Sequence, residues 1–244
     1  MRGFTAVLKR ELTSYFTHPT AYAVIVIFLL MSTVFAFTYG NFLEARLAEL
    51  SVSFFFYHPL LHMLLVPAVG MRLWSEEQRT NTIELLGTMP ISPFAAILGK
   101  FAAACCVWLI ALALSFPMVL TVDYLGDPDF YTITAGYLGS FLVAACFLAL
   151  TMLISAFSRD QVVTLIGSIA ACMVLVLIGY EPAAEVLYKG LDESVADSIM
   201  RLSVFTYFDE INKGLFRLSS LLYFLLMIGV CLWGTAIVIR SKRA

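Results

Sequence analysis

The sequence WSEEQRTNTIELLGTMPISPFAAILGK, residues 74–100, is the most polar stretch in the first half of the chain. Glu76, Glu77, Arg79 and Glu84 lie close together in it, whereas Phe, Leu, Ala and Val dominate the segments on either side. We interpret the stretch as a hydrophilic hairpin between two apolar helices. The nature of those flanking helices decides the fold.

The composition indicates a membrane protein. Of 244 residues, 61% are hydrophobic and 13% are charged, and the mean hydropathy is +0.92. Soluble domains are about 45–50% apolar, and about a quarter of their residues are charged. A soluble fold of this length cannot bury so much apolar surface, so the surrounding solvent must be lipid. The five cysteines lie in apolar runs without zinc-like spacing, and we expect them to be packing residues.

Six apolar stretches have the length of a membrane-spanning helix, which needs about 20 residues because each residue rises about 1.5 Å. Pro67 and Pro117 are expected to kink the helices that contain them. The predicted fold class is therefore an all-α polytopic membrane protein with six transmembrane helices. The expected spans are 20–39, 54–73, 101–122, 133–157, 162–180 and 219–239.

The distribution of charge predicts the orientation of these spans. If the N-terminus is cytoplasmic, 10 of the 15 Lys and Arg residues lie on the inner side, and 12 of the 17 acidic residues lie on the outer side. Short cytoplasmic loops of membrane proteins carry an excess of Lys and Arg. We therefore expect both termini, and residues 74–100 between the second and third spans, to be cytoplasmic.

The N-terminal segment, residues 1–19, has the pattern of an amphipathic helix that lies in the membrane interface. Lys9 and Arg10 fall away from its apolar face. The alternative is an ordinary basic anchor before the first span. The apolar face consists of Phe4, Leu8, Leu12, Tyr15 and Phe16.

The segment 181–218, on the opposite side, also contains apolar residues at helical spacing. We expect two short amphipathic helices that dip into the outer leaflet, or alternatively a plain surface loop.

Within the hairpin, Thr80 or Thr82 is expected to cap a short helix, and Pro90 and Pro93 bracket its exit. This helix should run parallel to the membrane, joined to the two spans by tight bends. Its acidic residues and its arginine should point into the cytoplasm. The alternative is a loop that is merely solvated.

Motifs for catalysis or nucleotide binding do not occur in the sequence. There is no G-x-S-x-G, no H-E-x-x-H and no G-x-x-x-x-G-K-[ST], so the chain does not bind ATP by a P-loop. Few charges lie in the middle of any span, which argues against an ion-coupled carrier. The energy source is therefore expected on another chain.

His58 and His62 are the only ligand-like pair, four residues apart on one helix face. Two ligands are too few for a metal site, and such histidines more often hydrogen-bond between helices. They are kept as weak metal candidates, and no metal is expected.

The hairpin resembles the first cytoplasmic loop of bacterial ABC-2-type transporter permeases, most closely those of the gliding-motility-associated subfamily. Asn81 replaces a glycine of the family pattern, and because Asn tolerates a left-handed backbone, we expect the turn to survive. SRDQVV (158–163) and YFDEINKGLFRLSSLLYF (207–224) also fit. The matching loop residues are Met71, Arg72, Glu76, Glu77, Arg79, Thr82, Glu84, Leu86, Pro90, Gly99 and Lys100.

The resemblance implies the membrane domain of a type V-like exporter in the bacterial inner membrane. Residues 74–100 would form a coupling helix that docks on a separate cytoplasmic ATPase subunit, which would bind ATP and Mg²⁺. By the same analogy, residues 1–19 lie beside the docking groove and residues 181–218 form a re-entrant hairpin at the outer gate. The residues implied to contact the ATPase are Glu76, Glu77, Arg79, Thr80, Thr82, Glu84 and Pro90.

The resemblance also implies partners. Two ATPase copies and a second permease, identical or related, are expected, together with membrane lipid and room for an extracytoplasmic auxiliary protein. No nucleic acid is expected. Two other functions stay open: a subunit that transmits motion to, or scaffolds, an envelope machine, and a metal-handling membrane protein based on His58 and His62.

Overall fold

The computed structural model describes residues 2–40, 50–82, 92–126, 128–180, 185, 189 and 192–242. Within these residues the chain is helical and contains no strand. Its elements in chain order are α1 (Arg2–Thr17), α2 (Pro19–Thr38), α4 (Leu50–Ser53), the 3-10 helix η1 (Phe55–Tyr57), α5 (His58–Gly70), α6 (Arg72–Arg79), α8 (Pro93–Leu114), α9 (Pro117–Leu125), α10 (Phe130–Phe157), α11 (Gln161–Leu177), α13 (Glu193–Met200), α14 (Val204–Asn212) and α15 (Leu218–Ser241).

The predicted all-α membrane architecture is confirmed. Within the described part of the chain, five segments are long and apolar enough to cross a membrane. The sixth expected span, 162–180, corresponds to α11, an apolar helix of 17 residues. At about 1.5 Å per residue it lies at the short end of what a bilayer requires. The five segments are Pro19–Thr38, Leu50–Arg79, Pro93–Leu125, Phe130–Phe157 and Leu218–Ser241.

The two proline positions behave differently. Pro117, where a kink was expected, lies at a break between two helices, because α8 ends at Leu114 and α9 begins at Pro117. Pro67 lies inside α5, which continues to Gly70. A proline at the first position of a helix removes no internal hydrogen bond, whereas one inside a membrane helix is tolerated when neighbouring helices pack around it.

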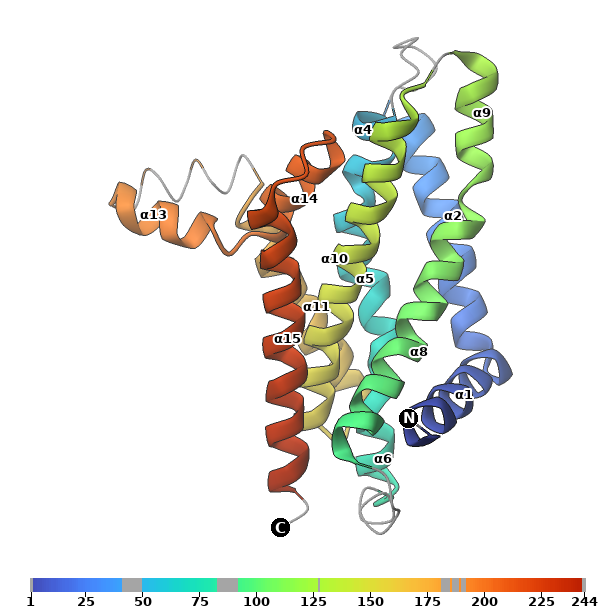
Figure 1. Cartoon of the computed structure of the whole chain (residues 1–244), viewed down its shortest axis with the longest axis vertical. Helices are drawn as coiled ribbons and strands as arrows, with labels where there is room; N and C mark the ends of the chain where they lie inside the picture. The colour runs from blue at the N-terminus through green and yellow to red at the C-terminus, as the bar shows by residue number, and fades with distance from the viewer. Residues whose placement is uncertain are drawn as a thin grey trace.

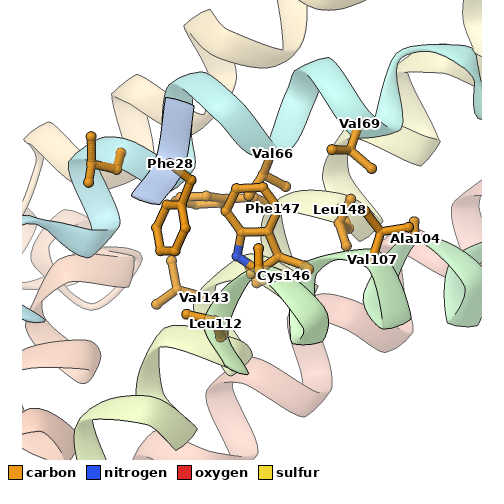
Figure 2. Packing of buried hydrophobic residues seen from close by; sticks show 14 of the residues in the cluster. Phe28, Val66, Val69, Ala104, Val107, Leu112, Val143, Cys146, Phe147 and Leu148 are labelled. Carbon is orange, nitrogen blue, oxygen red and sulfur yellow. The ribbon is translucent and has the colours of Figure 1, made fainter. Parts of the chain in front are cut away.

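The core lies between α2, α5, α8 and α10, as Figure 2 shows for Phe28, Val66, Val107 and Phe147, all fully buried. Lipid offers helices little hydrophobic reason to associate, so small residues that let backbones approach closely matter more. Gly70 of α5 is such a residue, because a Cβ there would lie 2.7 Å from Cγ2 of Thr151 on α10.

Two short helices occupy the described part of the segment 181–218. Phe208 and Ile211 of α14 are buried against Gly139 of α10, and the Asn212 side chain donates a hydrogen bond to the carbonyl of Ser51, 2.8 Å away. Helix α13 extends sideways from the bundle (Figure 1). Residues 181–184, 186–188 and 190–191 lie outside the described residues, and the position of this segment in the outer leaflet stays a prediction.

Helix α1 lies across the end of the bundle that also holds α6 and the end of α15 (Figure 1). Its contact with α8 is close at Gly99, where a Cβ would lie 2.9 Å from Cγ1 of Val7 and 3.3 Å from the carbonyl oxygen of Phe4. Val7 is buried, and Tyr15 of the predicted apolar face packs against the core and donates a hydrogen bond to the Val69 carbonyl at 3.0 Å, whereas Lys9 is exposed. Part of the apolar face of α1 therefore packs on protein.

Gly99→Leu should separate α1 from α8, because the added side chain meets Val7 and backbone. Overpacking of this kind costs about 1–3 kcal/mol. The matched control is Gly229→Leu on α15, where a Cβ would meet nothing within 4 Å. We expect the melting temperature of the purified protein in detergent to fall for Gly99→Leu and to stay unchanged for Gly229→Leu. Equal melting temperatures for the two variants would contradict this close approach.

Candidate functional site

A cluster of four charges joins α1, α6 and α8 at one end of the bundle. Lys100 of α8 has a side chain that is only 3% exposed, and its Nζ lies 3.1 Å from Oε1 of Glu11 on α1 and 3.1 Å from Oε1 of Glu77 on α6. Arg10 Nη2 contacts the same two oxygens, at 2.6 Å and 3.2 Å. Two cations therefore share two carboxylates, and three helices far apart in sequence are tied together.

The neighbouring charges favour the charged forms of Glu11 and Arg10. Burial opposes ionisation of Glu11, but the charges of Lys100 and Arg10 outweigh it and lower the pKa of the carboxyl. Burial likewise works against the charge of Arg10, yet Glu11 and Glu77 raise its pKa. Lys100 Nζ also lies 5.3 Å from the ring centre of the fully buried Trp74, within the range of a cation–π contact.

The short helix expected to begin at Thr80 or Thr82 would occupy residues 83–91, which lie outside the described residues, so it stays a prediction. Residues 74–79 before it belong to α6, which continues the second span beyond its expected end at residue 73 as far as Arg79. The reason is that Trp74 and Gln78, one turn apart, are both buried. Glu77 consequently points into the protein instead of the cytoplasm, whereas Arg79 is exposed and Glu76 is partly buried.

A second set of contacts fastens α6 to α10 and α15. The Gln78 side-chain amide donates to the carbonyls of Ser155 and Ala156, at 2.9 and 2.8 Å. Lys242 Nζ donates to Gln78 Oε1 at 2.5 Å and to the Ala156 carbonyl at 2.8 Å. The last carbonyl groups of a helix have no hydrogen-bond donor within that helix. The side chains of Gln78 and Lys242 provide donors for the last carbonyl groups of α10.

Sequence reasoning missed both Gln78 and Lys242. The only signal was that Gln78 follows Trp74 by one turn and so shares its helix face.

The turn after α6 confirms the expected left-handed residue. Asn81 has φ 55, its N–H donates to the Gln78 carbonyl at 3.4 Å, and the Thr82 N–H donates to the Glu77 carbonyl at 3.0 Å. This is a Schellman motif, a common helix ending that usually contains glycine. Thr80 is thus the C-cap of α6 and starts no helix, and the Thr82 hydroxyl contacts that of Thr80 at 3.0 Å.

The rest of the expected coupling segment, residues 83–91 with Glu84 and Pro90, lies outside the described residues. The role of that segment stays a prediction.

The two histidines lie in the bundle core. His58 Nδ1 and the Ser140 hydroxyl of α10 are 2.7 Å apart, which matches the expectation of a hydrogen bond between helices. His62 packs against Phe28 and Trp108. In the residues that the structure describes, no group of three or more His, Cys, Asp or Glu side chains comes together to hold a metal.

Lys100→Met should destabilise the protein because it leaves the carboxylates of Glu11 and Glu77 with Arg10 alone. Removing one partner of a buried ion pair costs about 3–5 kcal/mol, and we expect about 2–3 kcal/mol here because the carboxylates keep some contact with water. The control is Lys189→Met, which removes an exposed pair with Glu185 at 2.6 Å. Thermal unfolding in detergent should show a large loss for Lys100→Met and almost none for the control. Equal losses would mean that the buried cluster contributes no more than a surface pair.

Comparison with known proteins agrees with this architecture. A family model described as "ABC-2 family transporter protein" matches residues 6–240, which is nearly the whole chain. A comparison with curated proteins gives no match. The likeness to the gliding-motility-associated subfamily therefore stays a resemblance. With five segments of its described residues able to cross a membrane and the family match over almost its full length, the chain belongs to the ABC-2 family of transporter proteins, as a multi-pass membrane domain.

Proposed function

We propose that this chain is the permease subunit of an ATP-driven exporter, and that residues 74–100 receive force from a separate cytoplasmic ATPase subunit. The proposal is supported by the contacts that attach both ends of this segment to the helix bundle. Helix α6 leads into it and α8 leads out of it, and Glu77 and Lys100 join these two helices directly. A push on the segment would therefore move both helices together.

The fastening extends further into the bundle. Through Glu11 the cluster includes α1, and through Gln78 the same short helix holds α10 and α15. Because α6 continues the second span without a loose linker, motion at the segment would reach four other helices. A rigid, charged element transmits force better than a flexible loop, and charges at an interface fix its register.

The ATPase partner is inferred from the family, and the cytoplasmic side is inferred from the distribution of Lys and Arg. Permeases of the ABC-2 family work with an ATPase partner, and this chain has no P-loop sequence of its own. Both ends of the described chain and residues 74–82 lie toward the same end of the bundle (Figure 1). The Lys and Arg bias favours the cytoplasm for that end. ATP and Mg²⁺ would be bound by the ATPase, and two permease chains would pair in the inner membrane.

A second candidate function is transmission of motion to an extracytoplasmic partner. It is favoured by α13, which extends away from the bundle and exposes Val195, at 45% of its surface. Reconstitution of the purified complex into vesicles separates the two functions. ATP-dependent movement of a solute or lipid supports export, whereas ATP hydrolysis without movement supports transmission.

Reversing two charges of the segment, Arg79→Glu with Glu84→Lys, should weaken ATPase docking. Glu77 is left intact because it belongs to the internal cluster. The control reverses one acid and one base at the other end, Asp123→Lys with Arg201→Glu, both exposed. We expect the amount of ATPase subunit that copurifies to fall roughly tenfold or more for the first variant and to be unchanged for the control. Wild-type recovery with the first variant would refute docking at this segment.

A further inference from the structure

A cavity of about 290 Å³ lies beside the charge cluster, between α1, α2, α5, α6 and α8. Its volume is at the lower end of the range for ligand sites, which suits a small polar group. Ala21, Ala68 and Val69 provide an apolar part of the wall, and charged side chains of α1, α6 and α8 provide another part. Further polar side chains complete the lining, those of Ser14, Tyr15, His18 and Thr20.

Two of the charged side chains that line the cavity have no ion-pair or hydrogen-bond partner in the part of the chain that the structure describes. Arg10, Glu11, Glu77 and Lys100 neutralise one another in the cluster. Arg72 and Glu76 also line the cavity, but among the described residues neither side chain takes part in an ion pair or a hydrogen bond. Among the described residues, the cavity wall therefore has one arginine and one glutamate without an ion-pair partner, Arg72 and Glu76, both from α6.

Two buried atoms of residues that line the cavity have no hydrogen-bond partner within the described part of the chain. Nε of Arg72 is a buried donor without an acceptor, and Oε2 of Glu77 is a buried acceptor without a donor. Each atom has less than 1 Å² of accessible surface, so it lies behind the cavity wall and not on it. A buried polar group with no partner costs about 1–3 kcal/mol, so a ligand that draws either side chain toward the cavity gains free energy. The complementary ligand carries an anionic acceptor for Arg72 and a cationic donor for the glutamates.

The order of the two charges along α6 matches one class of ligand. Glu76 follows Arg72 by four residues, so the two share a helix face and lie about 6 Å apart along the axis. Arg72 is the nearer of the two to the middle of the bundle, because α6 runs outward to the bundle end. In a phospholipid with an ethanolamine headgroup, the phosphate lies next to the glycerol and the ammonium lies farther from the acyl chains.

We propose that this cavity binds the headgroup of a phosphatidylethanolamine-type lipid. The phosphate contacts Arg72, the primary ammonium lies between Glu76 and the free oxygen of Glu77, and the glycerol end faces the apolar wall at Ala21 and Val69. A primary ammonium has three N–H donors for the carboxylates, whereas the trimethylammonium of a choline lipid has none. A phosphatidylglycerol headgroup has the phosphate but no cation for Glu76. The proposal stands independently of the ATPase-docking function.

The experiment is a titration of the purified full-length chain in detergent with short-chain lipids, followed by calorimetry. The probes are dihexanoyl phosphatidylethanolamine, phosphatidylglycerol and phosphatidylcholine, together with inorganic phosphate. The wild type should bind phosphatidylethanolamine more tightly than the other three. Arg72→Gln should weaken binding of both phosphatidylethanolamine and phosphatidylglycerol by roughly tenfold or more, since each loses a charge-assisted hydrogen bond.

Glu76→Gln should weaken only phosphatidylethanolamine binding, and this difference separates a zwitterion site from a simple anion site. The matched control is Arg159→Gln, which neutralises an exposed arginine in the turn between α10 and α11 and should change nothing.

Three results would overturn the proposal: equal wild-type affinity for phosphatidylethanolamine and phosphatidylcholine, inorganic phosphate binding as tightly as the lipid, or an unchanged affinity in Glu76→Gln. If a variant fails to fold, the proposal is tested by the wild-type affinities alone, by comparing phosphatidylethanolamine with phosphatidylcholine and inorganic phosphate.

Discussion

The buried ammonium of Lys100 is the constraint on which this end of the molecule depends. A lysine that is almost fully buried must have carboxylates beside it, because an unpaired charge in such a place is strongly unfavourable. Here the carboxylates come from α1 and α6, so both helices are held where Lys100 can reach them. Gly99, the residue before Lys100, lets α1 approach closely enough for Glu11 to do this.

The need for a carboxylate beside Lys100 also explains why the second span continues as a helix into the polar residues of α6. Residues of α6 look like a solvated loop when read along the chain, but half of them are buried against the bundle. Trp74 and Gln78 pack inward, Glu77 reaches Lys100, and Arg79 faces outward. The helix then stops at a Schellman turn on Asn81. A stiff element fastened at its sides and ended sharply is well suited to carry a force into the bundle.

Much of the fold was predictable, since apolar length marks spans regardless of tertiary detail. The all-helical architecture, the break at Pro117 and the left-handed Asn81 follow from local rules that act within a few residues. The pairing of Glu77 with Arg10, 67 positions away, was not predictable, because helical spacing gives no information on which distant helix lies opposite. Gln78 was missed for the same reason: its partners are carbonyls of α10, which no side-chain pattern reveals.

The most direct measurement is the distance between spin labels on α1 and α6, at Lys9→Cys and Arg79→Cys, both exposed positions, in a background without the five native cysteines. Double electron–electron resonance should give one narrow distance distribution for the protein with Lys100. The distribution should become broad or shift when Lys100→Met is added, because α1 then loses its tie to α6. Identical narrow distributions with and without Lys100 would show that the charge cluster does not hold these helices together.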